Sequence, residues 1–435
     1  MKVLIKQATI VSPSSPFNGH IKDILIDKGI IAGISDNISD SDASIIEQPG
    51  LHVSIGWMDI FAHFCDPGLE YRETLESGAD AAAAGGFTDV MLLPNTNAAV
   101  HNKSQVEYIV QKAKAMPVNI YPIGAVTKNT EGNELAEMYD MQQSGALAFG
   151  DGINAIQNSG LLIKALQYVK TFNGTIIQLP DDRSIAAHGL MNEGIVSTQL
   201  GLPGKPMMAE ELIVARDIKL ARYADSRLHF TGVTSPKSLE YIKRAKESGI
   251  QITCSVTPYH LFFNEEDLRS YDTNLKVNPP LRDAVSQSAL LKALFDGTVD
   301  CIASHHIPYN YDNKVCEFEY AKNGMIGLES LFGVVWSMVN GESSMVNGEG
   351  SMVNSQWAIG KMVEKLAVAP RRIFGLPVPV IEENSAAKLT LFNPDTTYVF
   401  EESMIRSKSK NSAFIGKQLK GKVIGIINGD KMYLN

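Results

Sequence analysis

The sequence lacks the features that would place the chain in a membrane, in an oxidising compartment or on nucleic acid. No apolar run approaches the about 18 residues of a transmembrane helix, and the N-terminus has no signal-peptide core. The four cysteines lie far apart without a C-x-x-C pair, and no Lys/Arg run accompanies the net charge of −9. We therefore expect a cytoplasmic protein with reduced thiols that binds neither nucleic acid nor membranes.

Most of the chain alternates between strand-like and helix-like segments. Eight short apolar runs occur between residues 59 and 304: DIFAH, TDVMLL, NIYPIG, LAFG, TIIQL, LHFTG, ITCSV and DCIAS. Eight β/α units predict a (β/α)8 TIM-type barrel, which we place at residues 53–384. The ends, 1–52 and 385–435, contain short β runs without long helices and predict a small β-sandwich domain built from both termini.

A seven-residue unit is copied three times near the end of the predicted barrel. SMVNGES, SMVNGEG and SMVNSQW begin at residues 337, 344 and 351. Gly341, Gly348 and Gly350 oppose a long helix there, so we interpret the repeat as a duplication that lengthens a surface loop.

The chemistry of such a barrel lies at the C-terminal ends of its strands, where the sequence places several polar residues. His63 alone is weak support for a metal, because an isolated histidine is more often structural. The residues that we expect at the strand ends are His63, Asn95, Asp151, Gln178, Thr231, Gly232, Tyr259, His260, His305 and His306.

Several segments resemble the dihydroorotases, the cyclic-amide hydrolases of pyrimidine synthesis within the amidohydrolase superfamily. They include GWMDIFAHFCDPG, LLPNTN, SGALAFGDG, GLPGKPMMAEELIVARDI, LKVNPPLR, DCIASHHIPY and NGMIGLESLFG. The resemblance covers nearly the whole chain and implies the barrel fold. It also implies zinc held by an H-x-H pair on the first strand, an Asp after the fourth, and a His after the fifth and the sixth.

The sequence departs from this family pattern at the metal positions. Phe61, Gln178 and Gly232 stand where the resemblance implies histidine ligands, whereas His63 and Asp151 match. If a four-ligand zinc site contributes roughly 10–16 kcal/mol, each lost ligand costs about 3 kcal/mol, or about a hundredfold in affinity. We therefore expect a degraded metal site and no zinc cofactor.

The resemblance also assigns catalytic and substrate-binding positions. His305 stands where the family has the Asp that carries the proton, so we expect this position to be inactive. Cys65 replaces the arginine that binds the substrate carboxylate, and Asn95 matches a substrate-binding position. A packed thiol is the simplest interpretation of Cys65.

Two hypotheses follow. In the first, the chain is a noncatalytic, homo-oligomeric dihydroorotase-like protein that serves as a scaffold for aspartate transcarbamoylase, as some dihydroorotase-like chains do. In the second, it is an active zinc-dependent dihydroorotase or related cyclic amidohydrolase with a rebuilt one-metal site. That site would use His63, Asp151 and His305, with His306 or Asp66 as base. We favour the first, since three donors are lost and an acidic group becomes a histidine.

Overall fold

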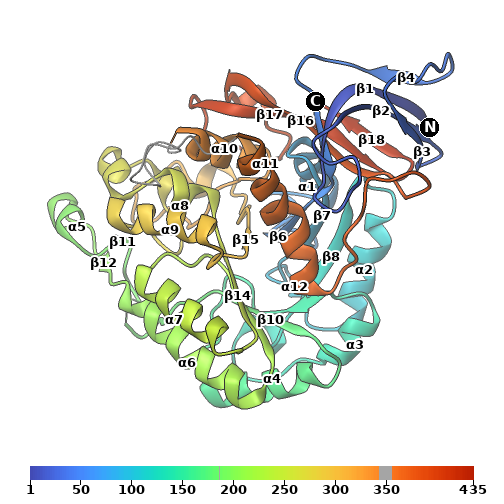
Figure 1. Cartoon of the computed structure of the whole chain (residues 1–435). Coiled ribbons are helices and arrows are strands. Elements are labelled where there is room, and N and C mark those ends of the chain that lie inside the picture. Colours follow the sequence, from blue (N-terminus) through green and yellow to red (C-terminus); the bar gives the residue numbers. More distant parts are fainter. Residues whose placement is uncertain (186, 342–354) are drawn as a thin grey trace.

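The computed structural model describes residues 1–185, 187–341 and 355–435, and a closed barrel dominates it (Figure 1). Eight strands form one parallel sheet in chain order: β6 (Trp57–Ala62), β7 (Phe87–Leu92), β8 (Asn119–Gly124), β9 (Ala148–Phe149), β10 (Thr175–Gln178), β13 (Arg227–Phe230), β14 (Ile252–Val256) and β15 (Cys301–Ile302). A parallel bridge between Ala62 and His306 joins the first strand to the segment after the last. The predicted eight-stranded barrel is therefore confirmed.

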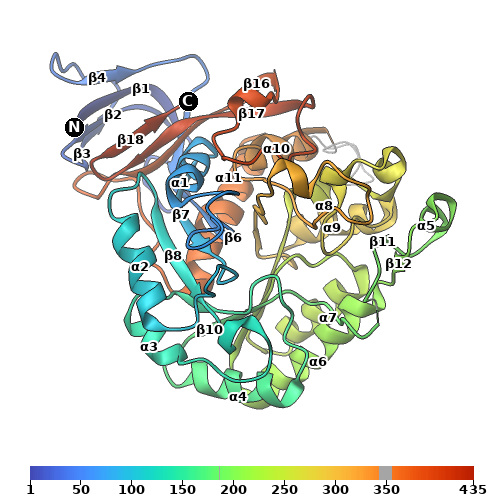
Figure 2. The same cartoon turned by 180° about the vertical axis from the view of Figure 1, so that it is seen from behind.

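Helices surround the barrel on its outer side (Figures 1 and 2). They are α1 (Leu75–Ala84), α2 (Lys103–Ala113), α3 (Met138–Gln143), α4 (Ser159–Lys170), α6 (Met208–Ala224), α7 (Pro236–Glu247), α8 (Pro258–Phe262), α9 (Ala284–Asp296), α10 (Leu331–Gly341), α11 (Ser355–Val363) and α12 (Ala369–Phe374). A π-helical segment, Glu364–Val368, connects α11 to α12. The two-stranded sheet of β11 (Met191–Asn192) and β12 (Gly204–Lys205) projects from the rim with α5 (Ile195–Leu200).

Local sequence explains where many of these helices begin. Thr74 precedes α1 and accepts a hydrogen bond from the backbone N–H of Ser77, while Ser77 bonds back in a capping box. Asp283 caps α9 with its side chain, which accepts the N–H of Ser286. None of the described helices is both long and apolar enough to cross a lipid bilayer.

The two chain ends meet in one curled sheet beside the barrel (Figure 1). Strand β16 (Lys388–Val399) pairs antiparallel with β5 (His52–Ile55), so C-terminal and N-terminal strands are direct neighbours. The other strands of this sheet are β1 (Lys2–Val11), β2 (Ile21–Asp27), β3 (Ile30–Ser35), β4 (Ser44–Ile46), β17 (Gln418–Asn428) and β18 (Lys431–Leu434). A small β domain built from both termini is thus confirmed.

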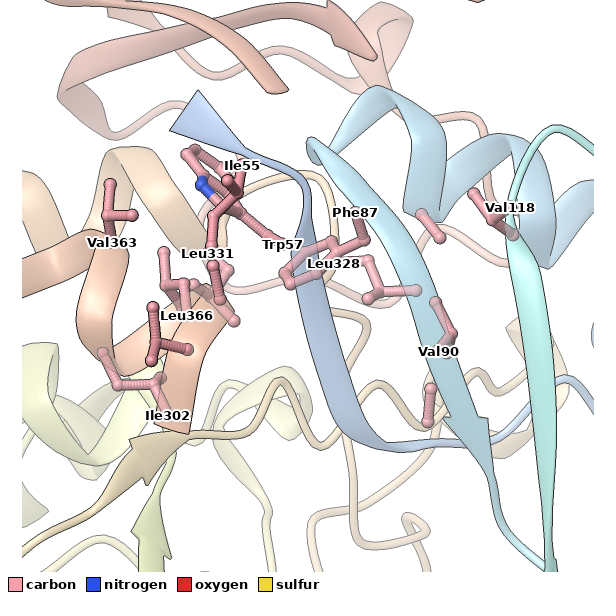
Figure 3. Close-up of a cluster of buried hydrophobic side chains, with 14 of the residues drawn as sticks. Ile55, Trp57, Phe87, Val90, Val118, Ile302, Leu328, Leu331, Val363 and Leu366 are labelled. Carbon is pink, nitrogen blue, oxygen red and sulfur yellow. The ribbon is translucent and has the colours of Figure 1, made fainter. Parts of the chain in front are cut away.

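Trp57 joins the terminal sheet to the barrel (Figure 3). Its ring centroid lies 4.9 Å from that of Phe332 and 5.5 Å from that of Phe392, and its indole N–H donates to Ser54 Oγ at 3.0 Å. Because the indole is fully buried, this hydrogen bond satisfies its one polar atom. Trp57 thus packs the terminal sheet against the barrel at their junction.

The barrel interior is filled by side chains and is not a channel. Met58, Ile60, Met91 and Ile177 form an apolar cluster there, and Phe374 of α12 belongs to it. The proposed duplication at SMVNGES begins in α10, and residues 342–354 lie outside the described residues, so that interpretation stays a prediction.

Candidate functional site

A cavity of about 420 Å³ opens at the C-terminal ends of the barrel strands. Its lining includes apolar side chains from several strand ends and charged side chains from the following loops: Phe61, Leu179, His305, Ile307, Asp181 and Lys205. Of the residues predicted at the site, His305 and Phe61 line this cavity. His63, Asn95 and Asp151 instead form a hydrogen-bonded group beside it.

His305 packs into the space that the residues around it leave open. Its ring is stacked on Phe61, with centroids 4.2 Å apart and an angle of 27° between the planes. A Cβ added to Gly232 would lie 2.8 Å from His305 Cε1, so any side chain at position 232 would collide with this ring. Phe61, Gly232 and His305 are therefore one interlocked packing unit.

A chain of hydrogen bonds leads from the barrel interior to His305. His229 Nε2 lies 3.1 Å from Ser255 Oγ, Ser255 Oγ donates to Thr231 Oγ1 at 3.0 Å, and Thr231 Oγ1 lies 2.7 Å from His305 Nε2. Burial lowers the pKa of His229 to about 3 and lowers that of His305 well below its ordinary value. Both imidazoles are therefore neutral at pH 7.

The backbone uses both ring nitrogens of His63. Nδ1 accepts the N–H of Cys65 at 2.9 Å, so the proton must be on Nε2, which donates to the Asn95 carbonyl at 3.1 Å. Burial lowers the pKa of His63 to about 4. This histidine is a neutral bridge between the ends of β6 and β7.

Asp151 is held by hydroxyl and backbone groups and forms no ion pair with another described residue. Its Oδ1 accepts the N–H of Thr127 at 2.9 Å, and its Oδ2 accepts the Thr127 hydroxyl at 2.5 Å. Burial raises the pKa of Asp151 to about 6, although these hydrogen bonds oppose the shift. The side-chain amide N–H of Asn95 donates to the backbone carbonyl of Asp151 at 3.0 Å, and Asn95 Oδ1 accepts the N–H of Ile153.

Gln178 does not face the cavity, which corrects the prediction for this position. Its amide contacts the backbone of Ile156 and donates to Asp217 on α6 at 3.1 Å, between the strand and the helix layer. The next residue, Leu179, lines the cavity. Because side chains alternate along a strand, a register error of one residue exchanges the inward and outward positions. Leu179 offers no metal donor either.

Cys65, His306 and Asp66 have structural contacts. Burial raises the pKa of Cys65 far above that of a free thiol, so it remains protonated. Asp66 accepts from Lys112 at 2.7 Å, and His306 Nε2 lies 3.5 Å from a Glu73 oxygen. Neither proposed base lines the cavity.

The donor set does not fit zinc. Within the described residues, no group of three or more His, Cys, Asp and Glu side chains is placed to hold a metal ion. His63, Asp151 and His305, the ligands of the hypothetical one-metal site, are each engaged by protein groups. Phe61, Leu179 and Gly232 supply no donor atom at all.

Sequence reasoning missed most of the polar residues of the cavity. Lys205 is buried and its ammonium lies 2.7 Å from Asp181 Oδ1 and 2.8 Å from Asn278 Oδ1. Asp181 and Asn278 lie in loops and Lys205 lies in the rim strand β12, so the three residues are far apart in the chain. The only signal available was that each follows or precedes a strand-like segment.

A solved hydrolase structure has the same architecture. L-Hydantoinase (dihydropyrimidinase) from Arthrobacter aurescens superposes with a TM-score of 0.81 over 100% of this chain and 96% of that one, at 22% identity. At this identity the likeness concerns the fold.

Sequence comparison identifies the family of the chain. The dihydro-orotase-like family model matches residues 52–238. The dihydroorotase of Syntrophus aciditrophicus is 37% identical over 427 residues, which cover 98% of this chain and 97% of that protein. The dihydroorotase of Geobacter metallireducens is 37% identical over 434 residues, 99% of each chain. The chain belongs to the dihydroorotase family.

Proposed function

We propose that the chain is a noncatalytic member of the dihydroorotase family, located in the cytoplasm, that acts as a scaffold for aspartate transcarbamoylase. The observation that carries the proposal is the packing unit at the mouth. The His305 ring is stacked on Phe61 and occupies the space above Gly232, where ligands would be needed. Three positions of the expected metal site are thereby turned into apolar or neutral packing.

The expected reaction needs a water molecule of lowered pKa, which zinc supplies in hydrolases of this kind. Without the metal, a protein group with a pKa near 7 would have to act as the base that activates this water. His305 is neutral and its Nε2 is bonded to Thr231, while His63 uses both ring nitrogens. Turnover of dihydroorotate at the background rate is the expected result.

The rest of the chain supports a structural role. The barrel closes, the two termini share one sheet, and the relatives align over almost the full length. A scaffold requires this fold and an outer surface but no metal. The four cysteines of the chain are free thiols, which is consistent with a reducing compartment.

The catalytic part of the proposal is tested on the purified full-length protein. Metal content is measured by plasma mass spectrometry after purification with added zinc, and dihydroorotate hydrolysis is followed in both directions. We expect less than one tenth of a zinc per chain and no rate above a blank. One tightly bound zinc per chain together with turnover would refute the noncatalytic assignment.

The partnership is tested by co-expression with the aspartate transcarbamoylase of the same organism, followed by sizing with and without EDTA. We expect a defined complex that resists the chelator and buries at least about 1,000 Å². A Lys243→Met variant, which changes an exposed cation on α7, serves as the handling control. Separate elution of the two proteins at micromolar concentration would refute the scaffold role.

A further inference from the structure

Another cavity lies at the N-terminal end of the barrel, on the side opposite the mouth. It has a volume of about 240 Å³ and is formed by the first residues of β10, β13 and β14 together with α12. Its polar lining consists of Thr175, Arg227, Gln251, Thr253 and Arg372, and none of the described residues that line it is an aspartate or a glutamate. A pocket with two guanidinium groups and no carboxylate attracts a compact anion.

The two arginines have N–H groups that a ligand can use. Arg227 is partly exposed, and its side chain has no hydrogen-bond or ion-pair partner among the described residues. Arg372 pairs with Glu364 through Nη1, at 3.1 Å, and its side chain is 68% exposed. Guanidinium groups bind phosphate oxygens through paired hydrogen bonds. The pocket therefore offers the donors that a phosphoryl group requires.

A series of hydrogen bonds starts at this pocket. Thr253 lies opposite His229 in the register of β14 and β13, and Ser255 follows two residues later on the same face of β14. Ser255 Oγ donates to Thr231 Oγ1, so the contact of 3.1 Å between Ser255 Oγ and His229 Nε2 requires the ring proton on Nε2. His229 Nδ1 is then an acceptor, and the Thr253 hydroxyl donates to it at 2.9 Å.

The series ends at the mouth. Thr231 accepts from Ser255 and donates to His305 Nε2 at 2.7 Å, so the ring proton of His305 is on Nδ1. Each hydrogen bond therefore points from Thr253, which lines the lower pocket, towards His305, which lines the cavity at the mouth. Such a relay has two consistent directions, because reversal of one bond alone would leave one contact without a hydrogen. The Thr253 hydroxyl and the tautomer of His305 are thus coupled.

We propose that the pocket at the N-terminal end binds a phosphoryl group and that its occupancy sets the tautomer of His305. The bound oxygens would contact Arg227 and would accept the hydroxyl hydrogen of Thr253, whose oxygen would then accept from His229 Nδ1. The inference goes beyond the scaffold role and does not depend on it, since the pocket and the relay belong to the barrel itself.

Reversal of the relay conserves protons and charge. One proton enters at Thr253 Oγ1 from water, each proton of the relay moves across its own hydrogen bond, and one proton leaves His305 Nδ1 to water. Every group is neutral before and after. The only lasting change at the mouth is that the ring proton of His305 is on Nε2.

Binding is measured by titration calorimetry on the full-length protein at pH 7 and constant ionic strength. Inorganic phosphate and glycerol 3-phosphate are the probes, and nitrate is the comparison anion. We expect saturable binding of one phosphoryl probe per chain, about tenfold or more tighter than that of nitrate. Tighter binding of glycerol 3-phosphate would identify the ligand as a phosphate ester, and tighter binding of inorganic phosphate would identify the free ion. Equal weak affinity for all three anions would overturn the proposal.

Substitutions locate the anion. Arg227→Gln and Arg372→Gln change side chains that are at least partly exposed, and each is expected to weaken phosphate binding about tenfold. Arg244→Gln on α7 is the matched control, because its side chain is 69% exposed and pairs with Glu240; it should bind phosphate like the wild type. Unchanged affinity in both pocket variants would place the anion elsewhere and refute the site.

The tautomer of His305 is read from the nitrogen-15 chemical shifts of its ring in protein labelled at histidine, with the spectrum of His305→Phe for assignment. Saturation with phosphate should move the proton from Nδ1 to Nε2. Thr253→Val keeps the shape of the side chain but removes the first hydroxyl, and Ser255→Ala interrupts the relay without altering the pocket lining. Both variants should bind phosphate without the change of tautomer. Binding in the wild type without this change, or a change that persists in both variants, would refute the relay.

Discussion

Each end of the barrel contains a buried carboxyl group, and the pKa values of the two groups are shifted in opposite directions. At the N-terminal end, Asp89 is in contact with the guanidinium of Arg371 and lies 2.9 Å from Lys388 Nζ. Burial opposes its ionisation, but the two cations more than offset this and hold the pKa of Asp89 below its ordinary value. At the C-terminal end, Asp151 accepts from the backbone N–H and the hydroxyl of Thr127, and burial raises its pKa to about 6.

Since Asp89 is 0% and Asp151 2% exposed, the partners rather than the burial decide the charge. The ionised group connects three parts of the fold: Asp89 in β7, Arg371 in α12 and Lys388 in β16. Arg371 also donates to the Gly56 carbonyl, between the terminal sheet and the barrel. Asp89 is thus held by charged partners that join parts of the fold, whereas Asp151 is held by uncharged hydrogen-bond donors.

Removing the guanidinium at the N-terminal end should have the largest effect. Arg371→Met leaves the Asp89 carboxylate buried with one cation, and the Gly56 and Ala367 carbonyls lose their donor. Breaking a buried pair in this way costs about 3–5 kcal/mol. Urea unfolding followed by circular dichroism measures the change in the free energy of unfolding.

Arg372→Met is the matched control for this experiment. Its side chain is 68% exposed and forms a surface pair with Glu364, so the expected loss is below about 1 kcal/mol. Equal losses in the two variants would mean that the buried ion pair of Arg371 stabilises the fold no more than the surface pair of Arg372 does.

The packing unit at the mouth can be tested with two glycines. Gly232 and Gly249 have φ values of +67° and +76°, but a Cβ at 232 would lie 2.8 Å from His305 whereas nothing lies within 4 Å of one at 249. Gly249→Ala should cost about 1 kcal/mol from backbone strain alone. Gly232→Ala should cost about 1–3 kcal/mol more, because the histidine ring must move.

A double-mutant cycle assigns this excess to His305. In the His305→Ala background, Gly232→Ala should cost no more than Gly249→Ala, when all variants are unfolded in urea at pH 7. Persistence of the excess without the ring would refute the packing unit.

The carboxyl of Asp151 should appear as a pH dependence of stability. Its pKa is about 6 in the folded chain and 3.8 ordinarily, so the folded state binds the proton more strongly between pH 4 and 6. This group therefore makes stability fall as pH rises through that window, by up to about 1.4 kcal/mol per pH unit. The pKa of His63 is lowered to about 4, so this group makes stability rise as pH rises.

The measurement is consequently the difference between Asp151→Asn and the wild type from pH 4 to 7. The variant should gain stability relative to the wild type as pH rises, and the curve should flatten above pH 6. A pH-independent difference would show that Asp151 ionises normally in the folded chain.

The sequence predicted the barrel well because each of its strands is a short apolar run between helical segments, a pattern local to a few residues. It placed His63, Asn95 and His305 at strand ends for the same reason. It failed at Gln178, where a shift of one residue exchanges the two faces of β10 and places Leu179 at the cavity.

The rest of the site depends on contacts that no local pattern contains. The hydrogen-bond chain from His229 through Ser255 and Thr231 joins two neighbouring strands and the loop after β13 to His305. The Lys205–Asp181 pair joins a rim strand to the loop after β10. Only the closed barrel brings these residues together.

Restoring one ligand at the mouth should have the smallest effect. Phe61→His places an imidazole next to His305, but His63 still donates to the Asn95 carbonyl and accepts from the Cys65 N–H. One added ligand contributes about 3 kcal/mol of the roughly 10–16 that a zinc site supplies. Groups that act as a unit also fail together, so one substitution restores no activity. We expect no stoichiometric zinc by plasma mass spectrometry and no dihydroorotate turnover. One chelator-sensitive zinc per chain would mean that the mouth lacks only a single ligand for metal binding. The contrast between the two ends of the barrel would then not hold.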